Sequence, residues 1–176
     1  MIDYAITLEF DKETENKMQA LIDEVAEATG CDYMKRAQIP PHVTVSALVS
    51  DKEKALLAEM ESIAETMKKG EVWFANIGVF NPLVIYLGPV MNAFLFNACK
   101  TVNERLLKYA DVGNRGNYLP YRWVPHAAIA VKLTPDALKT AFGIVQERFT
   151  AFGATAEKIV LARAVPYEAL CSWKLK

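Results

Sequence analysis

Cysteine is too scarce and too scattered in this chain of 176 residues to predict a disulfide framework. Cys31, Cys99 and Cys171 are odd in number, lie far apart and form no C-x-x-C pair, which also disfavours a zinc site. The sequence has no run of about 18 uncharged apolar residues, and its N-terminus lacks the basic and apolar segments of a signal peptide. We therefore expect no transmembrane helix and a location in the reducing cytoplasm.

An excess of charge of one sign is also absent, because 20 Lys+Arg face 21 Asp+Glu and the net charge is −1. Such a chain is not typical of proteins that coat long nucleic acids. The halves differ, however: residues 1–88 carry 8 Lys+Arg and 15 Asp+Glu (−7), and residues 89–176 carry 12 and 6 (+6). The basic half can attract an anionic ligand, although an uneven spread of surface charge explains the same numbers.

The apolar pattern predicts an ordered alternation of strands and helices. Strands are expected at 4–10, 42–49, 71–80, 83–87, from about 126, at 155–165 and at 167–175; helices at 12–28, 51–69, 92–110 and 134–149; and a turn at Asn81-Pro82. This order repeats one unit imperfectly: strand, helix, a strand that opens with Pro-His, helix, strand. We predict a duplicated α+β fold in which residues 1–176 form one bilobal domain, with two mostly antiparallel sheets, helices outside and a groove between the lobes.

Histidine occurs only twice, and both copies occupy the same place in the repeat. His42 and His126 each follow a proline directly, and each opens a predicted strand. They lie 84 positions apart, which is one repeat. If the two halves are related by a twofold axis, the two imidazoles face each other across the groove.

The two-residue period of a strand predicts which neighbours share the histidine faces. Thr44 and Ser46 are expected on the face of His42. Ala128, Ala130 and Lys132 are expected on the face of His126. Both histidines are thereby predicted to lie on the less bulky side of their strands.

Two imidazoles facing one groove suit the cleavage or transfer of a phosphodiester. One takes a proton from the attacking hydroxyl or water, and the other gives a proton to the leaving oxygen. A pKa of about 6.5 suits histidine to both roles. A hydroxyl beside the pair, such as that of Thr44, can hold a nonbridging phosphate oxygen. No cofactor is required, and two histidines without nearby carboxylates make a poor metal-binding set.

The motifs His42-Val43-Thr44-Val45 and His126-Ala127-Ala128-Ile129, set in a duplicated chain, resemble those of the two-histidine (2H) phosphoesterase superfamily. Its 2′-5′ RNA ligase and cyclic phosphodiesterase members are the most similar, and the resemblance covers nearly the whole chain. It implies a bilobal fold, a metal-independent active site in the groove, and activity on 2′,3′-cyclic phosphates or 2′-5′ linkages of RNA or nucleotides. It also implies that His42 and His126 are the catalytic pair and that Thr44 binds phosphate.

The second motif departs from this pattern, because Ala128 stands where the family has a hydroxyl. Loss of one oxyanion donor costs about 100- to 1000-fold in rate. We expect Lys132, a water or a backbone amide to take its place. The departure also leaves two alternatives open: a weakened or non-catalytic module that binds nucleotides or RNA ends, and a phosphodiesterase for a small, non-RNA cyclic phosphate.

Substrate contacts beyond the phosphate are expected from the segment that precedes His126. Tyr118, Tyr121, Arg122 and Trp123 offer flat faces on which a base can stack, although burial in the core explains the aromatic residues equally well. Arg115 lies in the long loop at 111–120, which can close over a substrate. The expected partners are RNA ends, nucleotides or small cyclic phosphates, and no membrane.

Overall fold

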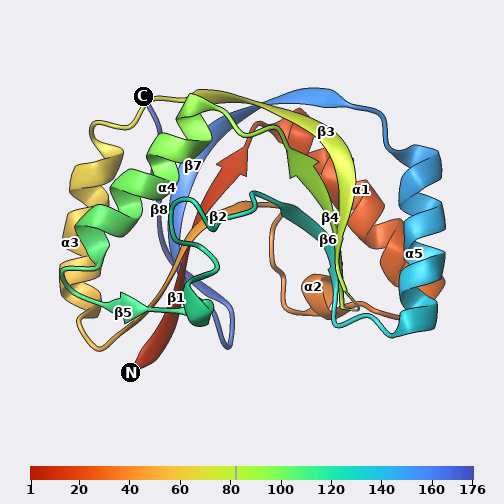
Figure 1. The fold of residues 1–176 in the computed structure, drawn as a ribbon, viewed down its shortest axis with the longest axis horizontal. Helices are drawn as coiled ribbons and strands as arrows, with labels where there is room; N and C mark the ends of the chain where they lie inside the picture. Colours follow the sequence, from red (N-terminus) through yellow and green to blue (C-terminus); the bar gives the residue numbers. More distant parts are fainter. Residues whose placement is uncertain (82) are drawn as a thin grey trace.

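The computed structural model describes residues 1–81 and 83–176, and its elements follow the predicted order (Figure 1). The strands are β1 (Ile2–Phe10), β2 (Val43–Ser50), β3 (Gly70–Phe80), β4 (Val84–Pro89), β5 (Asp111–Val112), β6 (Ala127–Val131), β7 (Phe152–Arg163) and β8 (Glu168–Lys174). The helices are α1 (Lys12–Thr29), α2 (Tyr33–Arg36), α3 (Glu53–Ala64), α4 (Ala93–Leu106) and α5 (Pro135–Arg148), with a 3-10 turn, η1, at Asn114–Gly116. The short elements α2, β5 and η1 lie in segments that were expected to be loops. The predicted turn at Asn81-Pro82 includes a residue outside the described ones.

Capping residues fix the ends of the long helices. The Asp11 carboxylate accepts the backbone N–H of Thr14 at 2.9 Å to begin α1, and Gly30 ends that helix with a φ of 70°. Thr134 caps α5 in the same way. Helix α3 ends earlier than predicted, because the segment after it hydrogen-bonds to the C-terminal residue, the N–H of Lys69 donating to the Lys176 carbonyl at 2.8 Å.

The strands pair antiparallel throughout the described residues, in the order β5-β2-β1-β7-β3-β4-β6, with β8 on β7. On each side of the central β7–β3 pair, the strand that follows a histidine is the second one out: β1 and then β2 on one side, and β4 and then β6 on the other. The α+β class and the antiparallel pairing are confirmed. The prediction of two separate sheets is wrong, because the 12 residues of β7 pair with β3 near their start and with β1 over the rest, which joins all strands. The division into two lobes stays a prediction.

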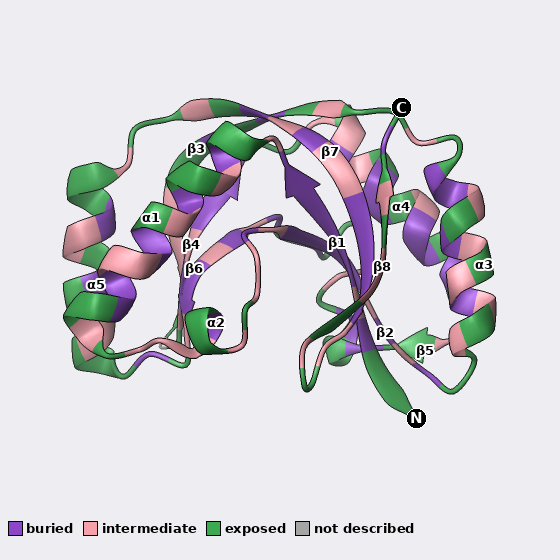
Figure 2. Ribbon diagram, turned by 180° about the vertical axis from the view of Figure 1, so that it is seen from behind, coloured by how far each residue is buried: buried purple, intermediate pink, exposed green. Residues whose placement is uncertain are grey.

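Helices α1 and α4 each pack on a strand of the other repeat. Helix α4, from the second repeat, packs on α3 and β2, whereas α1, from the first repeat, packs on α5 and β6. Figure 1 shows these two helix pairs at opposite ends of the molecule, with the strands arching between them. Figure 2 shows that the helix sides facing the strands are buried and the outer sides exposed. Besides these long helices, the short helix α2 contacts β6 and the 3-10 turn η1 contacts β2.

Candidate active site

The two histidines occupy equivalent positions immediately before β2 and β6, and both are half-buried. Nδ1 of His42 lies 2.7 Å from the carbonyl oxygen of Pro40, and Nδ1 of His126 lies 2.8 Å from that of Val124. A carbonyl oxygen only accepts, so in each ring Nδ1 carries the hydrogen and donates it. The proton that chemistry requires is therefore gained or lost at Nε2. The same contact, two residues upstream, orients both rings.

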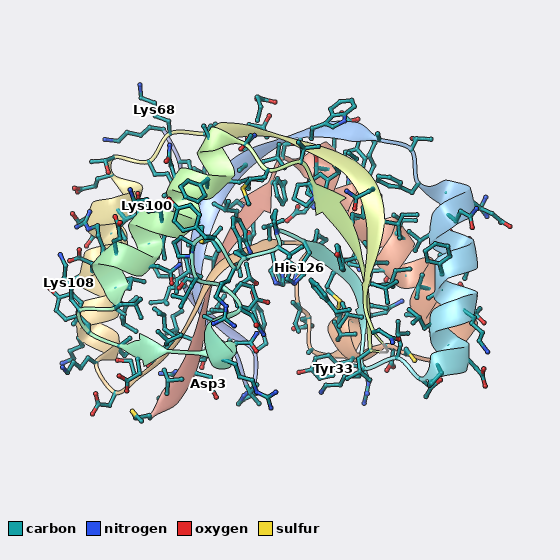
Figure 3. All side chains as sticks on the ribbon, viewed as in Figure 1. Asp3, Tyr33, Lys68, Lys100, Lys108 and His126 are labelled. Carbon is teal, nitrogen blue, oxygen red and sulfur yellow. The ribbon has the colours of Figure 1, made fainter. Side chains whose placement is uncertain are left out.

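Both histidines line one cavity of about 600 Å³. Thr44 of β2 and Ala128 of β6 line it between them, so the two motifs meet there as the repeat predicts. Figure 3 shows His126 reaching into the space beneath the arch of strands, with Tyr33 at the lower edge of that space. The geometry brings together two imidazoles and one hydroxyl around a volume that can hold a small ligand.

A β-bulge in each histidine strand decides which residues face this cavity. In β2, Ser46 pairs with Ile6 but Thr44 pairs with Thr7, so Val45 is an extra residue. In β6, the same shift makes Ile129 the extra residue. Each bulge lies three positions after its histidine. The strict alternation that predicted the shared faces therefore fails beyond the bulge.

The bulge turns Ser46 away from His42. Ser46 is fully buried on the helix side, where its hydroxyl donates to Oδ1 of Asn103 on α4 at 3.0 Å. Thr44, before the bulge, stays on the cavity side and is 9% exposed. The prediction that Ser46 shares the face of His42 and Thr44 is wrong, and Thr44 is the one motif hydroxyl that reaches the described cavity wall.

The bulge at Ile129 also removes Lys132 from the cavity wall. Val131 lines the cavity instead, β6 ends there, and Lys132 takes a left-handed conformation with a φ of 59°. Its Nζ lies 3.4 Å from the centre of the Tyr33 ring, in a cation–π contact. The predicted position of Lys132 on the face of His126 is therefore wrong.

Burial lowers the pKa of both histidines from its ordinary value. For His42 the hydrogen bond to Pro40 raises the pKa in part, and the positive charge of a protonated His126 lowers it further. The two imidazoles thus sense each other's charge, and protonation of one disfavours protonation of the other. One neutral and one protonated ring is the state that acid–base catalysis needs.

Aromatic rings surround His126. Phe80 meets its ring edge-on at 4.8 Å between centres, and the rings of Tyr86 and Tyr118 lie at 5.4 Å and 5.9 Å. Tyr86 can lie flat on the sheet because its cross-strand partner is Gly78, where a Cβ atom would come within 2.1 Å of the tyrosine ring. The second histidine thus lies in a more aromatic setting than its position in the sequence indicated.

Among the described lining residues, Arg122 is the one with a permanent charge, and none is a carboxylate. Its guanidinium gives the cavity a positive bias that suits an anionic ligand. Tyr118 also lines the cavity, so two of the four residues flagged before His126 reach it.

The other predicted substrate contacts do not line the cavity. Tyr121 is 89% exposed and packs against Phe96, with 5.1 Å between ring centres. Trp123 is only 7% exposed. Arg115 is exposed on η1 with a φ of 54°.

Sequence reasoning missed several residues that shape the cavity. Tyr33 and Ile39 come from the segment around α2, and Asn114 and Asn117 come from the loop at 111–120. Tyr33 carried no signal, because only the folded chain brings α2 beside β6. The length of this loop predicts a substrate contact, but the two asparagines line the cavity and the predicted residue, Arg115, does not.

A buried asparagine ties this loop to β2. Asn103 on α4 is 3% exposed; its amide donates to the carbonyl oxygens of Cys99 at 2.8 Å and Tyr118 at 3.1 Å, and its Oδ1 accepts the Ser46 hydroxyl. A helix, the first histidine strand and the segment carrying Tyr118 thus meet at one side chain. A lone asparagine in an amphipathic helix gives no such signal in the sequence.

Two half-buried histidines stand immediately before the matching strands β2 and β6 and line one cavity. The fold and the site therefore define a class of protein with two imidazoles in one site. The chain belongs to the 2′-5′ RNA ligase superfamily, whose family model matches residues 12–166. This confirms the resemblance to 2H phosphoesterases, and membership supports a phosphoesterase function.

Solved structures agree in fold. LigT of E. coli, solved with 3′-AMP, is 16% identical with a TM-score of 0.64, and TT0787 of Thermus thermophilus is 16% identical with a TM-score of 0.63. Both alignments cover 99% of this chain and 98% of the other. Usb1 of Kluyveromyces marxianus is 14% identical with a TM-score of 0.50, covering 96% and 97%. Among curated proteins, none matches the sequence significantly.

Residues 1–81 and 83–176 hold no group of three or more His, Cys, Asp or Glu side chains placed to bind a metal ion. None of the helices in these two ranges has both the length and the apolar character needed to cross a membrane.

Proposed function

We propose that this protein is a phosphodiesterase that opens 2′,3′-cyclic phosphates or cleaves and forms 2′-5′ linkages at RNA ends or in nucleotides, with His42 and His126 as general acid and base. The observation that carries the proposal is the matched pair of imidazoles. Both donate Nδ1–H to a carbonyl two residues upstream, and both line one cavity. Membership of the 2′-5′ RNA ligase superfamily supports the same chemistry.

Ring opening follows from this arrangement in one displacement. A neutral imidazole accepts at Nε2 a proton from water as the water oxygen bonds to phosphorus. The bond from phosphorus to O2′ or O3′ breaks, and the protonated second imidazole gives its Nε2 proton to the leaving oxygen. The product is a phosphate monoester. The Thr44 hydroxyl donates to a nonbridging oxygen, where negative charge builds in the transition state.

The nature of the cavity favours a nucleotide or the end of an RNA. Its volume of about 600 Å³ suits a small ligand, and Arg122 supplies positive charge without an extended basic track. Phe80 and Tyr118 offer ring faces beside His126 on which a base can stack. The structural neighbour LigT has been solved with 3′-AMP and also with ATP, NADP+ and phosphate, which agrees with a nucleotide ligand here.

The test is turnover, with chelator present, of a 2′,3′-cyclic nucleotide, a short RNA ending in a cyclic phosphate, a 2′-5′ dinucleotide and a small non-nucleotide cyclic phosphate, followed by phosphorus NMR. His42→Ala and His126→Ala should each lose about 100- to 10,000-fold in rate. Thr44→Val should lose activity while Thr44→Ser, which keeps the hydroxyl, retains it. Wild-type rates in both histidine variants would contradict the proposal.

A second candidate function rests on Ala128. A site that lacks the second motif hydroxyl can bind a phosphate without turning it over, and the same fold then serves as a nucleotide or RNA-end binding module. Saturable binding of a 3′-phosphorylated nucleotide by calorimetry, with no product from any of the four substrates, is the result that would favour this function over catalysis. Turnover of the small cyclic phosphate alone would instead identify an enzyme outside RNA metabolism.

A further inference from the structure

We infer that the Tyr118 hydroxyl supplies the phosphate hydrogen bond that Ala128 lacks. This inference rests on the proposed function and assigns a phosphate-binding role to a residue outside both histidine motifs. Its basis is the position of the tyrosine between the two motifs.

Tyr118 contacts both halves of the site. Its ring lies 5.9 Å from that of His126, between centres, and Ala128 lines the same cavity. Thr44 and Asn114 line this cavity together with Tyr118. Tyr118 and Thr44 also line a second cavity of about 310 Å³ beside the first, so they stand together at the boundary between the two. Tyr118 therefore lies close to Thr44, the proposed phosphate-binding residue of the intact motif.

The protonation state of the phenol suits a donor. Burial raises the pKa of Tyr118 above its ordinary value, and the contacts with Asn114 and Thr44 lower it only in part. At neutral pH the group is therefore a neutral O–H, able to donate to a phosphate oxygen.

The backbone of Tyr118 is held where this role requires. Its carbonyl oxygen accepts a hydrogen bond from the Asn103 side-chain N–H at 3.1 Å and lies 3.5 Å from Sγ of Cys99. Both partners belong to α4, so this helix holds the Tyr118 backbone in place. Asn103 is in turn bonded to Ser46 of β2. Asn103 thus connects the loop that bears Tyr118 to the strand that bears Thr44.

The alternatives within the cavity fit the role less well. Lys132 is held over Tyr33 beyond the end of β6 and does not line the cavity. Arg122 and Asn117 line the cavity, but both are exposed. Tyr118 is half-buried and touches both motifs.

The experiment combines Tyr118→Phe, which removes only the hydroxyl, with Ala128→Thr, which restores the motif. Tyr121→Phe is the matched control, because it makes the same change at an exposed tyrosine three residues away. The readouts are kcat on a 2′,3′-cyclic nucleotide and the Kd of 2′-AMP and 3′-AMP by calorimetry, with Tm as a check on folding. We expect Tyr118→Phe to lose about 100-fold in kcat and about tenfold in affinity, and Tyr121→Phe to match the wild type.

The rescue decides whether the hydroxyl substitutes for the missing one. Ala128→Thr should raise kcat much more in the Tyr118→Phe background than in the wild-type background, because the second hydroxyl is redundant when the first is present. Wild-type kcat and affinity in Tyr118→Phe, or the same factor of change from Ala128→Thr in both backgrounds, would overturn the inference.

The experiment also separates this inference from the proposed function. If the wild-type protein binds the nucleotides without turning over any substrate, catalysis fails but the affinity of Tyr118→Phe still tests the hydroxyl. If the wild-type protein turns over and Tyr118→Phe equals it, only the inference fails. Absence of both turnover and binding in the wild type overturns both.

Discussion

Replacement of Asn103 by leucine tests whether one buried amide holds the site together. Leucine is similar in shape but neither donates nor accepts. The change leaves the Ser46 hydroxyl, which is fully buried, and the Tyr118 carbonyl without their Asn103 partner. A buried polar group without a partner costs about 1–3 kcal/mol, so two give about 2–6 kcal/mol. We expect about 2–4 kcal/mol, since the Cys99 thiol remains beside the Tyr118 carbonyl as a weak donor.

Urea unfolding followed by circular dichroism measures this loss. Ser46→Ala is the partner variant, and the double variant Asn103→Leu/Ser46→Ala completes a cycle. Because the double variant removes both ends of the Ser46–Asn103 bond, its loss should be smaller than the two single losses together by about 1 kcal/mol. An unfolding free energy within about 0.5 kcal/mol of wild type for Asn103→Leu, or strict additivity in the cycle, would refute the reasoning, because surface changes of no structural weight fall in that range.

Acid pH, Gly78 and Lys132 provide three further tests. Burial lowers the pKa of both histidines, so below about pH 6.5 the unfolded chain binds more protons than the folded chain. The contribution of the histidines to the unfolding free energy should therefore be complete above that pH and lost as the pH falls through the folded-state pKa. In urea titrations, His42→Gln should make the unfolding free energy fall less steeply with decreasing pH. Gly78→Ala should displace the Tyr86 ring and destabilise the protein by about 1–3 kcal/mol, measured by the same titrations, and an unchanged midpoint would contradict the close contact. Lys132→Ala should keep kcat on a cyclic nucleotide within about threefold, because the ammonium lies over the Tyr33 ring and Lys132 does not line the cavity. A loss near 100-fold would show instead that Lys132 contacts the phosphate.

The features that the sequence could predict depend on spacing along the chain. The matched positions of His42 and His126 follow from the repeat, and the structure places both on one cavity. The ends of α1 follow from local capping by Asp11 and Gly30, which needs no tertiary information. Pairing between sequential strands likewise made the antiparallel arrangement predictable.

The features that could not be predicted depend on contacts between distant segments. A bulge is an extra residue relative to a partner strand, so Val45 and Ile129 show nothing unusual until the register with β1 and β4 is known. That one-residue shift moved Ser46 and Lys132 off the predicted face. The joining of all strands into one sheet likewise depends on the pairing of β7 with both β1 and β3. The length of β7 allows this pairing, but its composition does not predict it.

The central claim is that the two imidazoles divide acid and base work between them. The most direct test compares His42→Ala and His126→Ala on a cyclic nucleotide and on a nucleoside 3′-(4-nitrophenyl phosphate), whose leaving group departs without a proton. General acid catalysis contributes about 100- to 10,000-fold for a poor leaving group and little for a good one. A division of labour predicts that both variants fail on the cyclic nucleotide and that one of the two recovers on the nitrophenyl ester. Equal losses on both substrates, or no loss on either, would contradict it.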